Sequence, residues 1–226
     1  KVSDSLATLN IGFNSIKTFS FSSPNLKRLN LSGNEITEFA DNVYLPCVTY
    51  LDLSMNHIIE IPPLSKFAPA LEILLAQYNF ISTSPTDFPL TISKIDLSHN
   101  CMKFITNIKN LTNLKELNVS HNRLKSIPSL PQSLQVFSAE SNEIAESPPI
   151  ALKSLTTLQL SGNSFTNIPD IRDSYISSLN MKNNKIQTFN VSNISSVTKK
   201  IDLTNNFIEE IPEDLYQMNR IQVISF

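Results

Sequence analysis

The chain has 226 residues, of which 41% are hydrophobic, and a formal net charge of −2. This content is enough for a sizeable core, whereas the weak negative charge gives no general attraction for nucleic acid or anionic lipid. The apolar runs are only a few residues long, far short of the roughly 20 residues that cross a bilayer, so no membrane span is predicted.

An asparagine recurs along the chain at intervals of 20 to 23 residues. A fixed period in this range is typical of a solenoid of stacked coils. The ladder asparagines, as we name them, are Asn14, Asn34, Asn56, Asn79, Asn100, Asn122, Asn142, Asn163, Asn184 and Asn206.

Apolar residues precede each ladder asparagine by eight, five and three positions, and another follows two positions later. Before Asn34 they are Leu26, Leu29 and Leu31. The alternation of the last two predicts a strand with one face in a core and one face free. A coil cannot bury its apolar side alone, so coils must stack. We expect the asparagine amide to bond backbone groups of its own coil and of the next one.

The full pattern, L-x-x-L-x-L-x-x-N-x-L, resembles the leucine-rich repeat family over nearly the whole chain, in about ten copies and a partial eleventh. The resemblance implies an α/β solenoid: a single horseshoe-shaped domain over residues 1–226, with a concave parallel β-sheet. Ala76, Ala139 and Thr198 replace leucines of the pattern. These smaller residues predict local changes in packing without loss of a coil.

The segments that return to the next strand are rich in proline and serine. They read "IPPLSKFAPA" (61–70), "STSPTDFPLT" (82–91), "IPSLPQS" (127–133), "ESPPIALKS" (146–154) and "IPDIRDSY" (168–175). Proline removes an amide that a helix interior needs, so the convex side is predicted to be 3₁₀, polyproline or extended. "IPEDLYQMNR" (211–220) is the best candidate for a short helical turn, because acidic residues follow its proline.

Catalytic signatures are missing from the sequence. The three glycines each lie one or two positions before a ladder asparagine, so no phosphate-binding loop is formed, and the patterns G-x-S-x-G, H-E-x-x-H and C-x-x-C do not occur. We therefore expect no enzyme, no cofactor and no small-molecule substrate. His99 and His121 precede consecutive ladder asparagines, so their Cα atoms are expected to lie about 5 Å apart, one strand spacing. A shared metal is conceivable there, but two hydrated histidines are the better interpretation.

Most of the concave face is predicted to be small and polar, and one part of it differs. Five side chains of the third and fourth coils converge there, namely Tyr50, Met55, Ile73, Leu75 and Tyr78. An exposed apolar cluster with a polar surround is typical of a protein-binding hot spot. Lys94, His99 and His121 are expected to form its rim on one side and Arg28 on the other. The alternative is a local register shift that turns some of these side chains into the core.

The two cysteines, Cys47 and Cys101, occupy different places in their repeats, and no cluster resembles the disulfide-bonded caps of extracellular arrays. This favours an intracellular, cytoplasmic location but leaves an extracellular one open. Five N-glycosylation sequons occur, about as many as chance gives in so asparagine-rich a sequence. Because no polar cap follows the partial last copy, we expect a piece of a longer protein.

Three functions remain open at this stage. The leading one is a non-enzymatic scaffold for intracellular signalling that binds a protein partner on its concave face. By family analogy, the second is the targeting or regulatory domain of a larger enzyme such as a phosphatase, kinase or cyclase. The third is a receptor ectodomain that binds a ligand.

Overall fold

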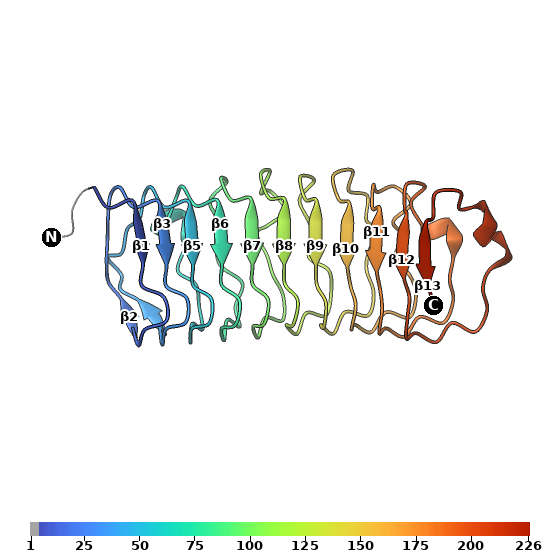
Figure 1. The fold of residues 1–226 in the computed structure, drawn as a ribbon, viewed down its shortest axis with the longest axis horizontal. Coiled ribbons are helices and arrows are strands. Elements are labelled where there is room, and N and C mark those ends of the chain that lie inside the picture. Colours follow the sequence, from blue (N-terminus) through green and yellow to red (C-terminus); the bar gives the residue numbers. More distant parts are fainter. Residues whose placement is uncertain (1–4) are drawn as a thin grey trace.

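The computed structural model describes residues 5–226 as a solenoid whose main sheet has eleven strands, all parallel (Figure 1). The coils follow one another in space in chain order, from β1 at one end to β13 at the other. The strands are β1 (Thr8–Asn10), β3 (Arg28–Asn30), β5 (Tyr50–Asp52), β6 (Ile73–Leu75), β7 (Lys94–Asp96), β8 (Glu116–Asn118), β9 (Val136–Ser138), β10 (Thr157–Gln159), β11 (Ser178–Asn180), β12 (Lys200–Asp202) and β13 (Val223–Ser225).

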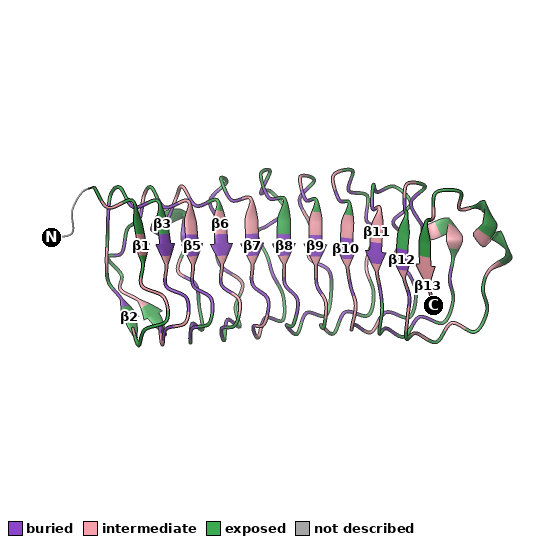
Figure 2. Cartoon of the chain, in the orientation of Figure 1, coloured by how far each residue is buried: buried purple, intermediate pink, exposed green. Residues whose placement is uncertain are grey.

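Each strand is three residues long and pairs in register with the next, so equivalent side chains form columns across the sheet. From β3 to β12 the middle residue is buried, while its two neighbours are half-buried or exposed on the concave face (Figure 2). The middle residues join one continuous core with the other leucine positions of the pattern. The predicted solenoid with a concave parallel sheet is confirmed.

The ladder asparagines link each coil to the previous one, as Asn56 shows. Its Nδ2 donates to the carbonyl of Leu31 in the previous coil at 2.9 Å, and to the carbonyl of Leu53 in its own coil at 3.1 Å. Its Oδ1 accepts from the amide of Ile36, again in the previous coil, at 3.0 Å. Buried backbone groups at the turn are therefore satisfied by side-chain amides, and the expected role of these asparagines is confirmed.

The residue just before each of the ten ladder asparagines has a left-handed backbone. This strand-end column contains glycine only twice, at Gly33 and Gly162. Its other left-handed members, with φ between 52° and 60°, are Phe13, Met55, Tyr78, His99, His121, Ser141, Asn183 and Asn205. For side chains other than glycine and asparagine this conformation carries a cost, so the bulky members are held there by the hydrogen bonds of the coil.

The return segments contain little regular structure, as the prolines predict. A single α-helical turn, α1 (Leu64–Phe67), follows Pro63, and two 3₁₀ turns occur, η1 (Val191–Asn193) and η2 (Glu213–Gln217). η2 lies where a helical turn was expected. A small two-stranded sheet of β2 (Thr18–Phe19) and β4 (Glu38–Phe39), which the sequence did not predict, runs along the return side of the first coils. No helix within residues 5–226 has the length and apolarity needed to cross a membrane.

The smaller residues at leucine positions keep their coils in register. Ala76 and Ala139 are fully buried, and the strands before them pair normally. Thr198 is also buried, and its hydroxyl donates to the carbonyl of Ile176 at 2.8 Å. The substitutions thus alter packing and leave the solenoid intact.

Candidate protein-binding surface

The apolar cluster predicted on the concave face lies on β5 and β6. Tyr50 pairs in register with Ile73, and Asp52 with Leu75. Leu74 and Ala76 point into the core, where both are fully buried. The register of the sheet is therefore regular here, and Ile73 and Leu75 stay on the concave face as half-buried side chains.

Met55 and Tyr78 continue this surface into the strand-end column. Their side chains are 51% and 50% exposed. Together with Tyr50, Ile73 and Leu75 they form the docking patch, a name we use for these five residues. The patch is an open surface spanning two coils, which suits a macromolecular partner better than an enclosed small molecule.

Arg28 borders the patch on the side of the first coils. Its guanidinium carbon lies 4.0 Å from the centre of the Tyr50 ring, within the range of a cation–π contact. The pKa of the Tyr50 hydroxyl is raised, first by partial burial and then by the nearby Asp52 carboxylate, while Arg28 and Lys94 act in the opposite direction. The hydroxyl therefore remains a hydrogen-bond donor throughout the neutral pH range.

Lys94 lies on the other side of the patch, where it pairs in register with Ile73. Its ammonium group lies 2.7 Å from a carboxylate oxygen of Glu116 in the next strand. Both side chains are roughly half exposed, so this ion pair orients the lysine and adds little stability. Asp96, on the same strand, accepts hydrogen bonds from Ser98 and from the Asn118 amide.

Tyr78, His99 and His121 form a stack of three nearly parallel rings, which we name the ring stack. The ring centres of Tyr78 and His99 are 4.1 Å apart, and those of His99 and His121 are 4.0 Å apart, each pair with an interplanar angle of 12°. The pKa of His99 is lowered, mainly by burial and then by His121, with Asp96 acting against the shift. The two histidines are thus packed on each other, with His121 exposed and His99 half-buried.

A metal at this pair would need further ligands from the chain. Within residues 5–226, no group of three or more histidine, cysteine or acidic side chains is placed to hold a metal ion.

Two aromatic residues that the sequence interpretation missed lie beside the patch. His57 and Phe80 stack on each other, with ring centres 5.8 Å apart and an interplanar angle of 14°. Each directly follows a ladder asparagine, in the same two coils that carry the patch. Phe80 is 54% exposed. The sequence signal for this pair is an aromatic ring directly after the ladder asparagine in two consecutive coils.

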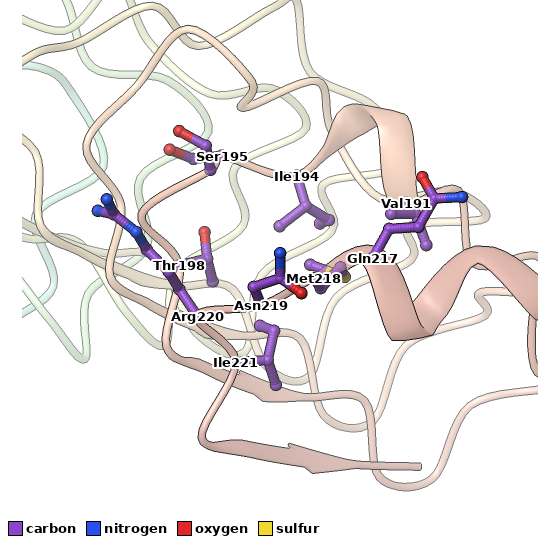
Figure 3. A pocket seen from close by; sticks show the side chains of 10 residues that line it. Val191, Ile194, Ser195, Thr198, Gln217, Met218, Asn219, Arg220 and Ile221 are labelled. Atoms are coloured by element: carbon purple, nitrogen blue, oxygen red, sulfur yellow. The ribbon is translucent and has the colours of Figure 1, made fainter.

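A pocket of about 370 Å³ lies apart from the docking patch, between the return segments of the last two coils (Figure 3). It borders Thr198, whose side chain is smaller than the leucine of the repeat pattern. The buried hydroxyls in its wall, Ser195 Oγ and Thr198 Oγ1, both donate to backbone carbonyls. Their donor capacity is therefore already used, and the pocket is a packing feature of this end of the array.

Three family models match the chain and together span about half of it. They describe a leucine-rich repeat at residues 4–58, leucine-rich repeats in two copies at residues 91–132, and a leucine-rich repeat at residues 154–172. The matched segments lie in the first, middle and later coils.

Three vertebrate relatives are similar over much of this chain. Rat osteomodulin is 35% identical over 181 residues, which cover 71% of this chain and 42% of the relative. Chicken lumican is 31% identical over 63% of this chain and 46% of the relative, and chicken fibromodulin is 33% identical over 54% and 33%. The chain thus spans less than half the length of these relatives.

Solved structures share the fold. YopM, a leucine-rich effector protein from Yersinia pestis, superposes with a TM-score of 0.81 at 24% identity, covering 97% of this chain and 60% of that structure. InlJ from Listeria monocytogenes superposes with a TM-score of 0.73 at 16% identity, covering 96% and 48%. At these identities the likeness concerns architecture.

The prediction of an intracellular, cytoplasmic array is wrong. Osteomodulin, lumican and fibromodulin are secreted or extracellular-matrix proteins, which conflicts with a cytoplasmic location. The prediction rested on two cysteines and on missing disulfide caps. Cys47 is an exposed free thiol and Cys101 a half-buried one, each within a regular coil. Such residues reflect local packing and carry little information about the compartment.

The repeat pattern, the asparagine ladder, the parallel sheet and the matched family models agree with one another. The chain belongs to the leucine-rich repeat proteins.

Proposed function

We propose that this chain is the ligand-binding array of an extracellular or cell-surface protein and that it binds a protein partner on its concave face through the docking patch. The observation that carries the proposal is the cluster of half-buried and exposed apolar and tyrosine side chains on a concave face that is mostly polar. The secreted and matrix relatives support the extracellular setting.

The column that contains Leu75 makes the contrast clear. Along the sheet, the partners of Leu75 in this column are all asparagine, aspartate, serine or glutamine. A leucine there is not needed for folding, because its neighbours show that the position accepts polar side chains. Exposed apolar residues beside tyrosines are typical of binding hot spots.

Backbone strain supports the same surface. Met55 and Tyr78 have φ angles of 55° and 57°, in a column where Gly33 and Asn183 adopt the left-handed conformation at lower cost. Neither side chain belongs to the core. Bulky residues held in a strained conformation without a packing role are often functional.

The polar rim complements the patch. Arg28 stacks on Tyr50, and Lys94 is held by Glu116, so two cations flank the apolar surface in fixed positions. A partner that places an apolar or aromatic side chain on the patch and carboxylates near Arg28 and Lys94 fits this arrangement.

The experiment compares capture of partners by three versions of the chain. Purified chain is immobilised and exposed to culture medium and to solubilised cell-surface proteins, and bound proteins are quantified by mass spectrometry. A protein that the wild type captures specifically should be reduced about tenfold or more on the double variant Tyr50→Ser/Tyr78→Ser. The reason is that loss of one hot-spot residue costs about 2 kcal/mol of binding free energy.

The matched control is Val136→Ser/Ser141→Ala. Val136 lies on β9 in the same column as Tyr50, and Ser141 lies in the same strand-end column as Tyr78. This control should change capture by less than about twofold. Circular dichroism and urea midpoints verify that all versions are folded. Equal retention by the wild type and the tyrosine variant would show that the patch is not the binding site.

A further inference from the structure

We propose that the ring stack is a proton-sensitive part of the docking surface: it is closed while the two imidazoles are neutral and opens when they are protonated. The device is a property of the chain alone. Its consequence for partner binding, which is that acid weakens attachment through Tyr78, rests on the proposed function.

The backbone fixes the spacing of the three rings. The amides of Tyr78, His99 and His121 donate to the carbonyls of Ser98, Ser120 and Glu140, at 3.1, 2.9 and 2.7 Å. Each ring is thus attached to a backbone that is bonded to the next coil. The coils cannot move apart without breaking these bonds, so repulsion between the rings can be relieved only by rotation of the side chains.

The acidic groups near the stack are already engaged by other partners. On β7, Asp96 accepts from Ser98 and Asn118. On β8, Glu116 is paired with Lys94, and at the end of β9 the Glu140 carboxylate accepts from Ser161 and Asn180.

Tyr78 and His121 are the rings stacked on His99, and the Asp96 carboxylate also acts on His99 through its charge, in favour of the protonated form. Among residues 5–226, none of the ion pairs involves a histidine. Positive charge on the stacked imidazoles is therefore not neutralised by a carboxylate contact.

Protonation acts directly on this geometry. Two like charges on stacked rings whose centres are 4.0 Å apart repel each other. The lowered pKa of His99 agrees with this repulsion, because it means that the folded chain favours the neutral imidazole. The closed stack is therefore most stable at neutral pH and above, and it weakens as the pH falls below the normal histidine range.

Nuclear magnetic resonance of the isolated, isotope-labelled chain tests the device. The chain has three histidines, and His57 stacks on Phe80 outside the ring stack, so it is an internal reference. Imidazole shifts are followed from about pH 8 to about pH 4.5, where ordinary histidines complete their titration. The titration curve of His99 should be broadened by its interaction with His121. The nuclear Overhauser contact between Tyr78 and His99 should disappear over the same range.

His121→Asn is the matched variant. Asparagine already occupies this column at Asn183 and Asn205, with φ angles of 56° and 60°, so the coil accepts it without new strain. In this variant the midpoint of His99 should move to higher pH and its curve should become a single step. The variant His57→Asn should leave the titration of His99 unchanged.

Two results would overturn the inference. One is a His99 midpoint that is the same in the wild type and in His121→Asn, because the rings would then not be coupled. The other is a Tyr78–His99 contact that persists at about pH 5, because protonation would then not open the stack. Both measurements use the chain without a partner, so failure of the proposed docking site would be recognised separately, by the capture experiment.

Discussion

At the scale of single residues, the ladder asparagines connect the sequence pattern to the fold. Asn122 is buried, and its amide donates to the carbonyls of Leu97, Val119 and Ser120 while accepting from the amide of Met102. No apolar residue can replace these bonds, because the turn they stabilise is shielded from water. The repeated asparagine is therefore a requirement of the backbone.

Replacing Asn122 with alanine should lower the free energy of unfolding by about 3 kcal/mol, because several buried backbone groups lose their partners. Urea denaturation followed by circular dichroism measures the change. Asn14→Ala is the control: Asn14 is exposed and, within residues 5–226, donates to Ile11 and Gly12 of its own coil, so its loss should cost less than about 1 kcal/mol. Equal costs for both variants would contradict the role of burial.

The sequence predicted the role of these asparagines but not the left-handed backbone of the residues that precede them. A tyrosine or histidine carries no sign of a left-handed backbone, since local preference disfavours it at bulky residues. Only the hydrogen bonds between coils impose that conformation on Tyr78 and His99. The ring stack follows from this conformation. Successive coils have the same backbone conformation at this position, so their side chains project in the same direction and the rings lie one above the other.

At the scale of elements, the period of two in the strands fixes which side chains reach the concave face. Leu74 is buried and Leu75 faces the concave side, although both are leucines in the same three-residue strand. The sequence alone left a register shift open here, because "LEILLAQYNF" contains apolar residues at both kinds of position. Pairing with the regular strands β5 and β7 decides the register.

Leu74→Asn and Leu75→Asn should therefore differ sharply in stability. The first removes a core leucine and buries an amide, so the free energy of unfolding should fall by about 4 kcal/mol or more. The second places a polar side chain between Asp52 and Asp96 in a column of polar residues and should change stability by about 0.5 kcal/mol at most. Thermal and urea unfolding of the two variants provide the measurement. Similar losses would mean that both leucines are in the core.

The structure of the return segments could be predicted from the sequence only in part. Proline predicted the absence of long helices, because it removes a backbone donor. The turn α1 and the pair β2–β4 were not predicted. Elements of two to four residues have too little local preference of their own and form only where neighbouring coils position them.

At the scale of the whole molecule, stability is a sum of coil and interface contributions, because each coil contacts only its neighbours. Core leucines in the middle coils are fully buried. In the last coil, by contrast, Leu215, Met218, Ile221 and Ile224 are only partly buried. In the isolated 226-residue chain, a coil with such partly buried core residues should thus open locally at a lower free energy than the middle of the array.

Ile224→Ala provides a direct test of this arrangement by amide hydrogen exchange. Truncation of a half-buried isoleucine should cost about 1–2 kcal/mol, so the amide of Leu203, which donates to Ser225, should exchange about tenfold faster. The amide of Val119, which donates to Ser138 near the middle, should be unaffected. Ile95→Ala, in a buried central strand, should instead accelerate exchange on both sides of β7. If Ile224→Ala accelerated every strand equally, the array would open as one cooperative unit, and the additive description would be wrong.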